Sequence, residues 1–231
     1  IMNTNEPQYI CGLKKCDFQT TINGKKSDLY ILKNKSGNEV AITNYGGAIQ
    51  AIMIPDKNGN YANVIQGHDN INSVINSPEP YLSTLIGRYG NRISKGKFQL
   101  NGKEYQLPIN NGPNSLHGGI NGFNKKVWDA LMMNNETLIL NYVSSYGEEG
   151  YTGEVKVTVE YTFNDNNELI IEYMATTNKK TIINLTSHGY FSLTGLSDPT
   201  PTVDSLLCEI NADFYLPIDD TCIPTGEIRF V

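Results

Sequence analysis

The sequence has no long apolar run, no excess of basic residues and no common cofactor-binding or hydrolase motif. No segment approaches the ~18 apolar residues that a membrane span requires, and residues 1–20 show no basic stretch followed by an apolar core. Lys and Arg number 18 against 24 Asp and Glu, and the net charge of −6 disfavours nucleic-acid and anionic-membrane partners. Walker, dinucleotide, H-E-x-x-H and G-x-S-x-G patterns do not occur.

Cysteine and histidine are also scarce. The four cysteines, at positions 11, 16, 208 and 222, have no metal-ligand spacing, so we expect no metal site. So few cysteines in a chain of this length favour free thiols and a cytoplasmic location. A periplasmic or secreted protein that had lost its signal peptide would give the same pattern. The three histidines are His68, His117 and His188.

What is present is typical of a β-rich domain. The nine residues 155–163 alternate between apolar and polar, which predicts a half-buried strand, and 168–175 predicts its hairpin partner across the turn at 164–167. Asn101-Gly102, between 97–100 and 104–107, predicts a type I′ hairpin. A further strand is expected at 138–143, and no window of helical length has a 3.6-residue period; the best is 81–85. We therefore expect an all-β antiparallel sandwich.

The length suits one domain over residues 1–231. The chain begins Ile1-Met2 and stops at Phe230-Val231, inside an apolar stretch without a turn or polar tail. We expect this domain to be truncated at its C-terminus.

Three segments carry polar residues that a plain strand does not need: 87–93 (GRYGNRI), 110–119 (NNGPNSLHGG) and 184–193 (NLTSHGYFSL). Arginine suits hydroxyl or carboxylate binding, and a histidine can act as acid, base or hydrogen-bond donor. Aromatic residues beside a polar donor are typical of sugar sites, because a pyranose has an apolar face and a hydroxyl rim. A purely structural role stays open for each segment, as a solvated loop or a histidine bonded to backbone.

Taken in order, these segments resemble the signature of the aldose 1-epimerase family. Residues 87–93 are similar to its G-R-x-A-N-R-I, and 184–193 to its N-L-T-N-H-x-Y-F-N-L. Residues 110–119, with 122–125 and Trp128, are similar to N-N-G-x-N-x-L-H-G-G…G-F-D-K…W. Weaker agreement is found at 44–47, 148–153, 215–217 and 223–227. The matches run from about Leu29 to the last residue.

The resemblance implies a large galactose mutarotase-like supersandwich with few helices, whose open face holds a hexose. It implies that α and β anomers of free aldohexoses such as galactose or glucose interconvert by acid–base ring opening and closure, without a cofactor or metal. By position, His188 is the general acid that protonates the ring oxygen and His117 is the second catalytic-site residue, binding the sugar near that oxygen. Asn91 and Arg92 hold hydroxyl groups.

The same resemblance assigns no general base. In the family this glutamate and a hydroxyl-binding aspartate lie in a C-terminal segment, and the sequence ends before both. Asp213, Asp219 and Glu227 are disfavoured as replacements, since Pro217 and Pro224 predict turns around them.

Three hypotheses therefore stay open: an epimerase, a non-catalytic sugar-binding or regulatory homologue, and a fragment of a longer enzyme. The sequence also departs from the family pattern at four positions within the matched part. These departures are Gly90, Asn124, Ser187 and Gly189.

Overall fold

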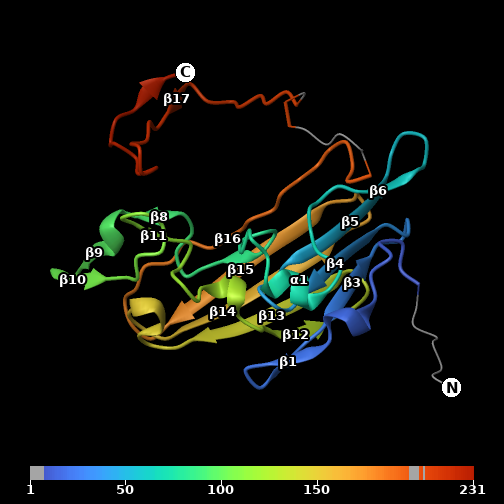
Figure 1. The fold of residues 1–231 in the computed structure, drawn as a ribbon, viewed down its shortest axis with the longest axis horizontal. Helices are drawn as coiled ribbons and strands as arrows, with labels where there is room; N and C mark the ends of the chain where they lie inside the picture. Colours follow the sequence, from blue (N-terminus) through green and yellow to red (C-terminus); the bar gives the residue numbers. More distant parts are fainter. Residues whose placement is uncertain (1–7, 198–202, 205) are drawn as a thin grey trace.

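Two four-stranded antiparallel sheets form the body of the computed structural model, which describes residues 8–197, 203–204 and 206–231. The first sheet has the order β3 (Leu29–Lys33), β4 (Glu39–Thr43), β5 (Ile49–Pro55), β6 (Tyr61–Asn63). The second has the order β12 (Asp129–Met132), β13 (Thr137–Ser144), β14 (Val155–Phe163), β15 (Leu169–Thr177). Strands that are consecutive in sequence are neighbours in space, so each sheet is a series of hairpins (Figure 1).

The predicted hairpins are confirmed. In β14 every second residue from Val155 to Phe163 is buried, and β15 pairs with it along nine residues. Strands β9 (Lys97–Leu100) and β10 (Lys103–Gln106) pair across Asn101 and Gly102, whose φ angles are 53° and 77°. Two consecutive positive φ angles are what a type I′ turn requires.

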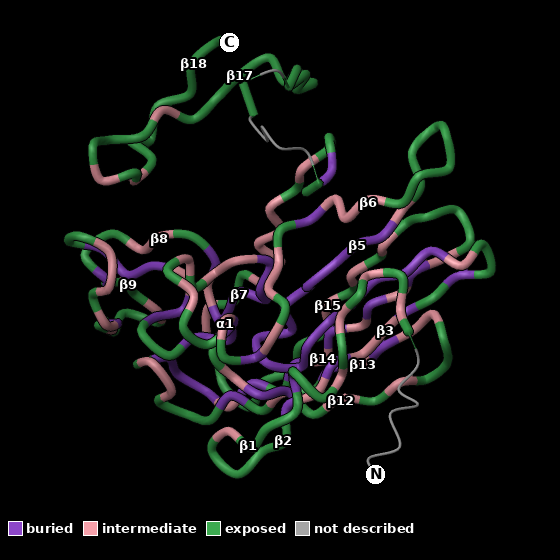
Figure 2. Tube along the Cα trace, turned by 45° about the vertical axis from the view of Figure 1, so that its right-hand side comes forward, coloured by how far each residue is buried: buried purple, intermediate pink, exposed green. Residues whose placement is uncertain are grey.

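The main core lies between the two sheets. The alternating face of β14 packs with residues of β13, β4 and β5, and the buried Trp128 is part of the same cluster. Figure 2 shows buried residues concentrated along these strands. Apolar burial on both inner faces is the main force that holds a sandwich together.

Strand β4 is buried along its whole length because it has a core on each face. Val40 and Ile42 face the main core, and Ala41 packs into a second cluster with Phe18 and Ile71. These last two belong to the 3₁₀ turn η1 (Lys15–Phe18) and to helix α1 (Ile71–Ile75).

Helix α1 was not predicted, because five residues are too few to show a helical period. Asn70 caps it, its side-chain oxygen accepting the Ser73 N–H at 2.9 Å. The window 81–85 with the best helical pattern is not a helix: it leads into strand β7 (Leu85–Ile86).

Short two-stranded pairs complete the fold. They are β1 (Thr20–Ile22) with β2 (Lys25–Ser27), β7 with β16 (Thr186–Ser187), β8 (Arg92–Ile93) with β11 (Ser115–Leu116), and β17 (Phe214–Tyr215) with β18 (Arg229–Phe230). Further 3₁₀ turns are η2 (Ser94–Gly96), η3 (Phe123–Lys125) and η4 (Glu148–Gly150).

The segment that carries β17 and β18 lies apart from the two sheets and is largely exposed (Figures 1 and 2). It reaches the body where the Asn114 side chain donates to the Thr221 carbonyl at 3.2 Å. Among the described residues, no helix is long and apolar enough to cross a membrane.

Removal of the Tyr161 hydroxyl tests the packing between the sheets. This hydroxyl is fully buried and donates to the Gly47 carbonyl at 2.8 Å. Tyr161→Phe leaves that carbonyl unpaired, so we expect a loss of about 1–3 kcal/mol in the free energy of unfolding, measured with urea. Tyr105→Phe, in the partly exposed β10, is the matched control; equal losses in the two variants would contradict this assignment.

Candidate functional site

Two short strand pairs bring the three polar segments together. In the pairing of β8 with β11, Arg92 lies opposite Leu116, the residue before His117. In the pairing of β7 with β16, Leu85 lies opposite Ser187, the residue before His188. The two histidines, 71 positions apart in sequence (188 − 117), thereby become neighbours, with ring centroids 5.1 Å apart.

The two imidazoles line an open groove. Its lining consists of Gly90, Asn91, His117 and residues 184–189. The imidazole planes are nearly perpendicular, at 86°. Of the four residues predicted for the site, His117, His188 and Asn91 line this groove, and Arg92 is bonded to Asn91 beside it.

His117 is held by a reciprocal pair of hydrogen bonds with Asn91. The Asn91 N–H donates to His117 Nδ1 at 2.9 Å, and the His117 N–H donates to the Asn91 carbonyl at 3.0 Å. Both residues have left-handed backbones, with φ of 51° for His117 and 64° for Asn91. Such backbones are uncommon outside glycine and cluster at functional sites. Because Nδ1 is an acceptor, the ring proton of neutral His117 is on Nε2.

His117 is also strongly biased toward its neutral form. Burial, followed by the nearby His188 and Arg92, lowers its pKa from the ordinary 6.5 to about 4. At neutral pH it is therefore an uncharged donor through Nε2–H and a poor general acid.

Arg92 is tied to two asparagine side chains. Its Nε donates to Asn111 Oδ1 at 3.0 Å and its Nη1 to Asn91 Oδ1 at 3.2 Å. In the described part of the chain, its remaining guanidinium N–H groups have no protein acceptor. Arg92 and the Asn91 amide N–H₂ therefore offer donors beside the groove.

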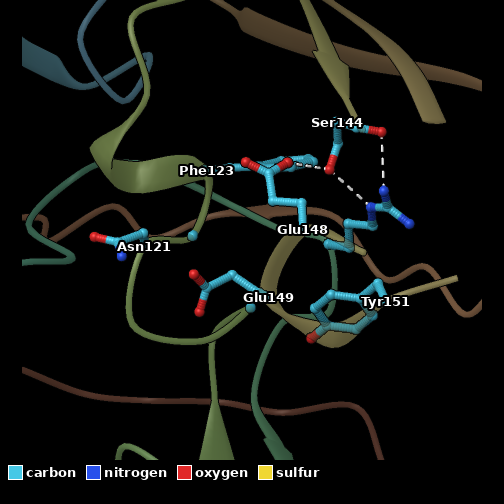
Figure 3. Close-up of a pocket in the computed structure, with 10 residues that line it drawn as sticks. Asn121, Phe123, Ser144, Glu148, Glu149 and Tyr151 are labelled. Atoms are coloured by element: carbon cyan, nitrogen blue, oxygen red, sulfur yellow. Dashed lines mark hydrogen bonds between the residues drawn. The ribbon is translucent and has the colours of Figure 1, made fainter. Parts of the chain in front are cut away.

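Arg88 has a different role from Arg92, although both lie in segment 87–93. Its side chain is buried, and its Nε donates to Ser144 Oγ at 2.8 Å. Its other donors bond the carbonyls of Ser144, Ser145 and Thr152 at 2.7–2.9 Å. Figure 3 shows Ser144 and Glu148 in this cluster; Glu148 accepts from Ser144 Oγ and forms an ion pair with Lys126. Arg88 is a structural anchor. The residue types alone did not separate it from Arg92, although the family resemblance singled out Arg92 by position.

The glycines of segment 110–119 allow backbone to approach backbone. A Cβ on Gly118, which has φ of 89°, would collide with the Gly87 carbonyl. One on Gly119 would meet the Glu149 carboxylate, which accepts the Ile120 N–H at 2.7 Å. The first contact fixes the segment that carries His117 against the segment that carries Arg88, and the second fixes it against η4.

Two tyrosines complete the surroundings of the histidines. Tyr190, from the aromatic pair noted in the sequence, lies 5.1 Å from His188 between ring centroids. Tyr81 lies 4.6 Å from His117 and 6.2 Å from His188. No sequence pattern pointed to Tyr81 as a site residue, because it lies outside the three polar segments.

Two of the three carboxylates weighed as replacement bases, Asp219 and Glu227, are engaged locally. Asp219 Oδ1 accepts from the backbone N–H groups of Thr221 and Ile223, and these bonds lower its pKa. Glu227 forms an ion pair with Arg229. Among the described residues, no group of His, Cys, Asp and Glu side chains could hold a metal ion.

Comparison with known proteins identifies the family. The family model for aldose 1-epimerase matches residues 28–231, and the chain belongs to that family. Galactose mutarotase from Bos taurus is 44% identical over 192 residues, which cover 83% of this chain and 55% of the relative. Aldose 1-epimerase from Escherichia coli (strain K12) is 32% identical over 214 residues, covering 90% and 59%.

Solved structures show the same fold. The GalM/aldose epimerase homologue from C. elegans aligns with a TM-score of 0.82 and 33% identity, over 88% of this chain and 61% of that one. Galactose 1-epimerase from Lactobacillus acidophilus gives 0.77 and 25%, over 91% and 60%. The predicted family and all-β fold are confirmed, and the chain spans little more than half the length of these relatives.

The pH dependence of His117 is directly testable. Because its folded pKa is about 4 and its ordinary value 6.5, the unfolded chain takes up the proton first as the pH falls. Stability should therefore decrease as the pH drops from 6.5 through 4, and His117→Gln should flatten that part of the profile. NMR of the histidine rings should show neutral His117 at about pH 5. Titration of His117 near 6.5 would contradict the arrangement.

The two arginines of segment 87–93 form a matched pair of variants. Arg88→Met leaves Ser144 Oγ and the carbonyls of Ser144, Ser145 and Thr152 without their buried donor, so we expect a loss of about 3–5 kcal/mol in unfolding free energy. Arg92→Met breaks bonds to two partly exposed amides and should cost about 1 kcal/mol or less. Urea unfolding measures both; equal losses would overturn the distinction between anchor and groove-side donor.

Proposed function

We propose that this chain carries the acid and hydroxyl-binding side of an aldose 1-epimerase site. The observation that best supports this proposal is the contact between His117 and His188, whose side chains are held in different ways. His117 is committed through Nδ1 and has its pKa lowered to about 4. Neither ring nitrogen of His188 is bonded to another group of the described chain, so both are available to a ligand in the groove.

Anomer exchange needs few chemical groups. Ring opening requires a proton to be delivered to the ring oxygen of the sugar and another to be removed from the C1 hydroxyl. Rotation about the C1–C2 bond and reclosure then give the other anomer. Positioned acids and bases contribute about 10²- to 10⁴-fold each to such proton transfers.

The two histidines have different roles in delivering the proton to the ring oxygen. His188, as imidazolium, protonates the ring oxygen and regains its proton on reclosure. His117, neutral, donates Nε2–H to an oxygen of the sugar. Two positive imidazoles at 5.1 Å would repel each other. A neutral His117 therefore lets His188 carry the charge alone.

Asn91 and Arg92 supply donors for the hydroxyl groups. The guanidinium plane of Arg92 is fixed by Asn91 and Asn111, so its unbonded N–H groups have a defined direction. Free aldohexoses such as galactose and glucose are the proposed substrates, in keeping with the names of the relatives. Neither a cofactor nor a metal enters this proposal.

A second candidate is sugar binding without turnover. It is favoured by the local engagement of Asp219 and Glu227, two of the carboxylates weighed as replacement bases. In that case the groove and its donors act as a recognition site.

Polarimetry of freshly dissolved α-D-galactose separates the two. If the protein accelerates mutarotation, His188→Gln should reduce the catalysed rate about 10²- to 10⁴-fold while sugar binding survives. His68→Gln, which changes the histidine outside the groove, is the control and should retain the rate. Equal turnover by His188→Gln would refute the acid role of His188. Sugar binding without any acceleration would favour the second candidate.

A further inference from the structure

The His188 ring lies between two tyrosine rings. Tyr190 is stacked on it with centroids 5.1 Å apart and planes at 26°. Tyr81 is also nearly parallel to it, at 6.2 Å and 29°. Tyr81 at the same time meets His117 edge-on at 4.6 Å and 69°. One tyrosine therefore contacts both imidazoles, and the other contacts His188 alone.

Hydrogen bonds hold the backbone of His188 and leave its ring free. The His188 N–H donates to the Thr84 carbonyl at 2.9 Å, and its carbonyl accepts the Ser83 N–H at 3.0 Å. Within the described residues the ring nitrogens have no protein partner. Histidines at catalytic and metal sites are usually oriented by a hydrogen bond to one ring nitrogen. Here ring packing is the contact that can orient the imidazole.

The backbone that carries Tyr81 is itself anchored. The buried Asn124 side chain donates to the Pro80 carbonyl at 2.9 Å. The Tyr81 N–H donates to Glu79 Oε1 at 3.2 Å, and its carbonyl accepts the Thr84 N–H at 3.1 Å. Asn124 stands where the family pattern usually has aspartate, and an ionised aspartate could not donate this bond.

Glu79 connects the two tyrosines. It bonds the backbone of Tyr81. Burial, and then the Glu79 carboxylate, which interacts with the Tyr190 hydroxyl, raise the pKa of Tyr190. Burial and the same carboxylate raise the pKa of Tyr81. Both phenols are therefore neutral at pH 7, as a rigid ring support requires.

We propose that Tyr81 and Tyr190 are positioning residues whose ring packing holds the His188 imidazole in one orientation toward the groove. The proposal deepens the proposed function, since orientation of His188 matters for catalysis only if His188 delivers the proton. The stacking itself is a separate property and can be measured without turnover.

NMR of the histidine ring protons measures the stacking directly. The chain has only three histidines, so their signals can be told apart. Protons held over an aromatic face resonate upfield, so the His188 ring protons should do so in the unaltered protein. Tyr81→Leu and Tyr190→Leu should each move these signals downfield, while Tyr81→Phe and Tyr190→Phe should keep them upfield. Tyr105→Leu is the matched control, because Tyr105 stacks on Phe98 in a hairpin away from the groove.

Mutarotation kinetics give the second measurement. In protein that accelerates the reaction, the Leu variants should lower kcat about 10- to 100-fold with little change in KM, and the Phe variants should restore it. Leu variants that shift neither the His188 signals nor kcat would overturn the proposal, as would Phe variants that behave like Leu. If the NMR shifts occur in protein that does not accelerate mutarotation, the proposed catalytic function is contradicted, whereas the orientation of His188 by the two tyrosines is supported.

Discussion

The buried guanidinium of Arg88 ties the groove to the second sheet. Its side chain bonds Ser144 at the end of β13, and the backbone around it bonds the segment that carries His188 and the 3₁₀ turn η3. The Arg88 carbonyl accepts the Asn184 N–H at 2.8 Å, and the Gly87 carbonyl accepts the Phe123 N–H at 3.2 Å. Because these bonds radiate from one short stretch, the geometry of the groove depends on a buried guanidinium that keeps all its hydrogen-bond acceptors.

The second feature of the site is that its two histidine side chains lie in different environments. His117 has its Nδ1 bonded and its charged form disfavoured by burial and by His188 and Arg92. His188 has its ring packed between Tyr81 and Tyr190 and its nitrogens open to the groove. Neighbouring titratable groups whose environments differ in this way are common where an enzyme needs one proton donor and one neutral partner.

Local patterns predicted much of the fold. The alternation in 155–163 became β14, and Asn101-Gly102 became the turn between β9 and β10, because period and turn chemistry act within a few residues. Helix α1 and the strand pairs of two residues each were not predicted. Elements this short have no period to detect, and tertiary contacts stabilise them.

The sequence by itself determined the β-rich class and the family signature, and it nominated His117, His188, Asn91 and Arg92 as site residues. These depend on residue types at fixed spacing, which the chain displays directly. Only the tertiary structure decided that Arg88 is an anchor whereas Arg92 lies beside the groove, that His117 is the neutral histidine, and that Tyr81 joins the site. Burial and hydrogen-bond partners separate these otherwise similar side chains, and both are set by residues far away in the sequence: Thr152 lies 64 positions from Arg88, and Asn91 lies 26 from His117.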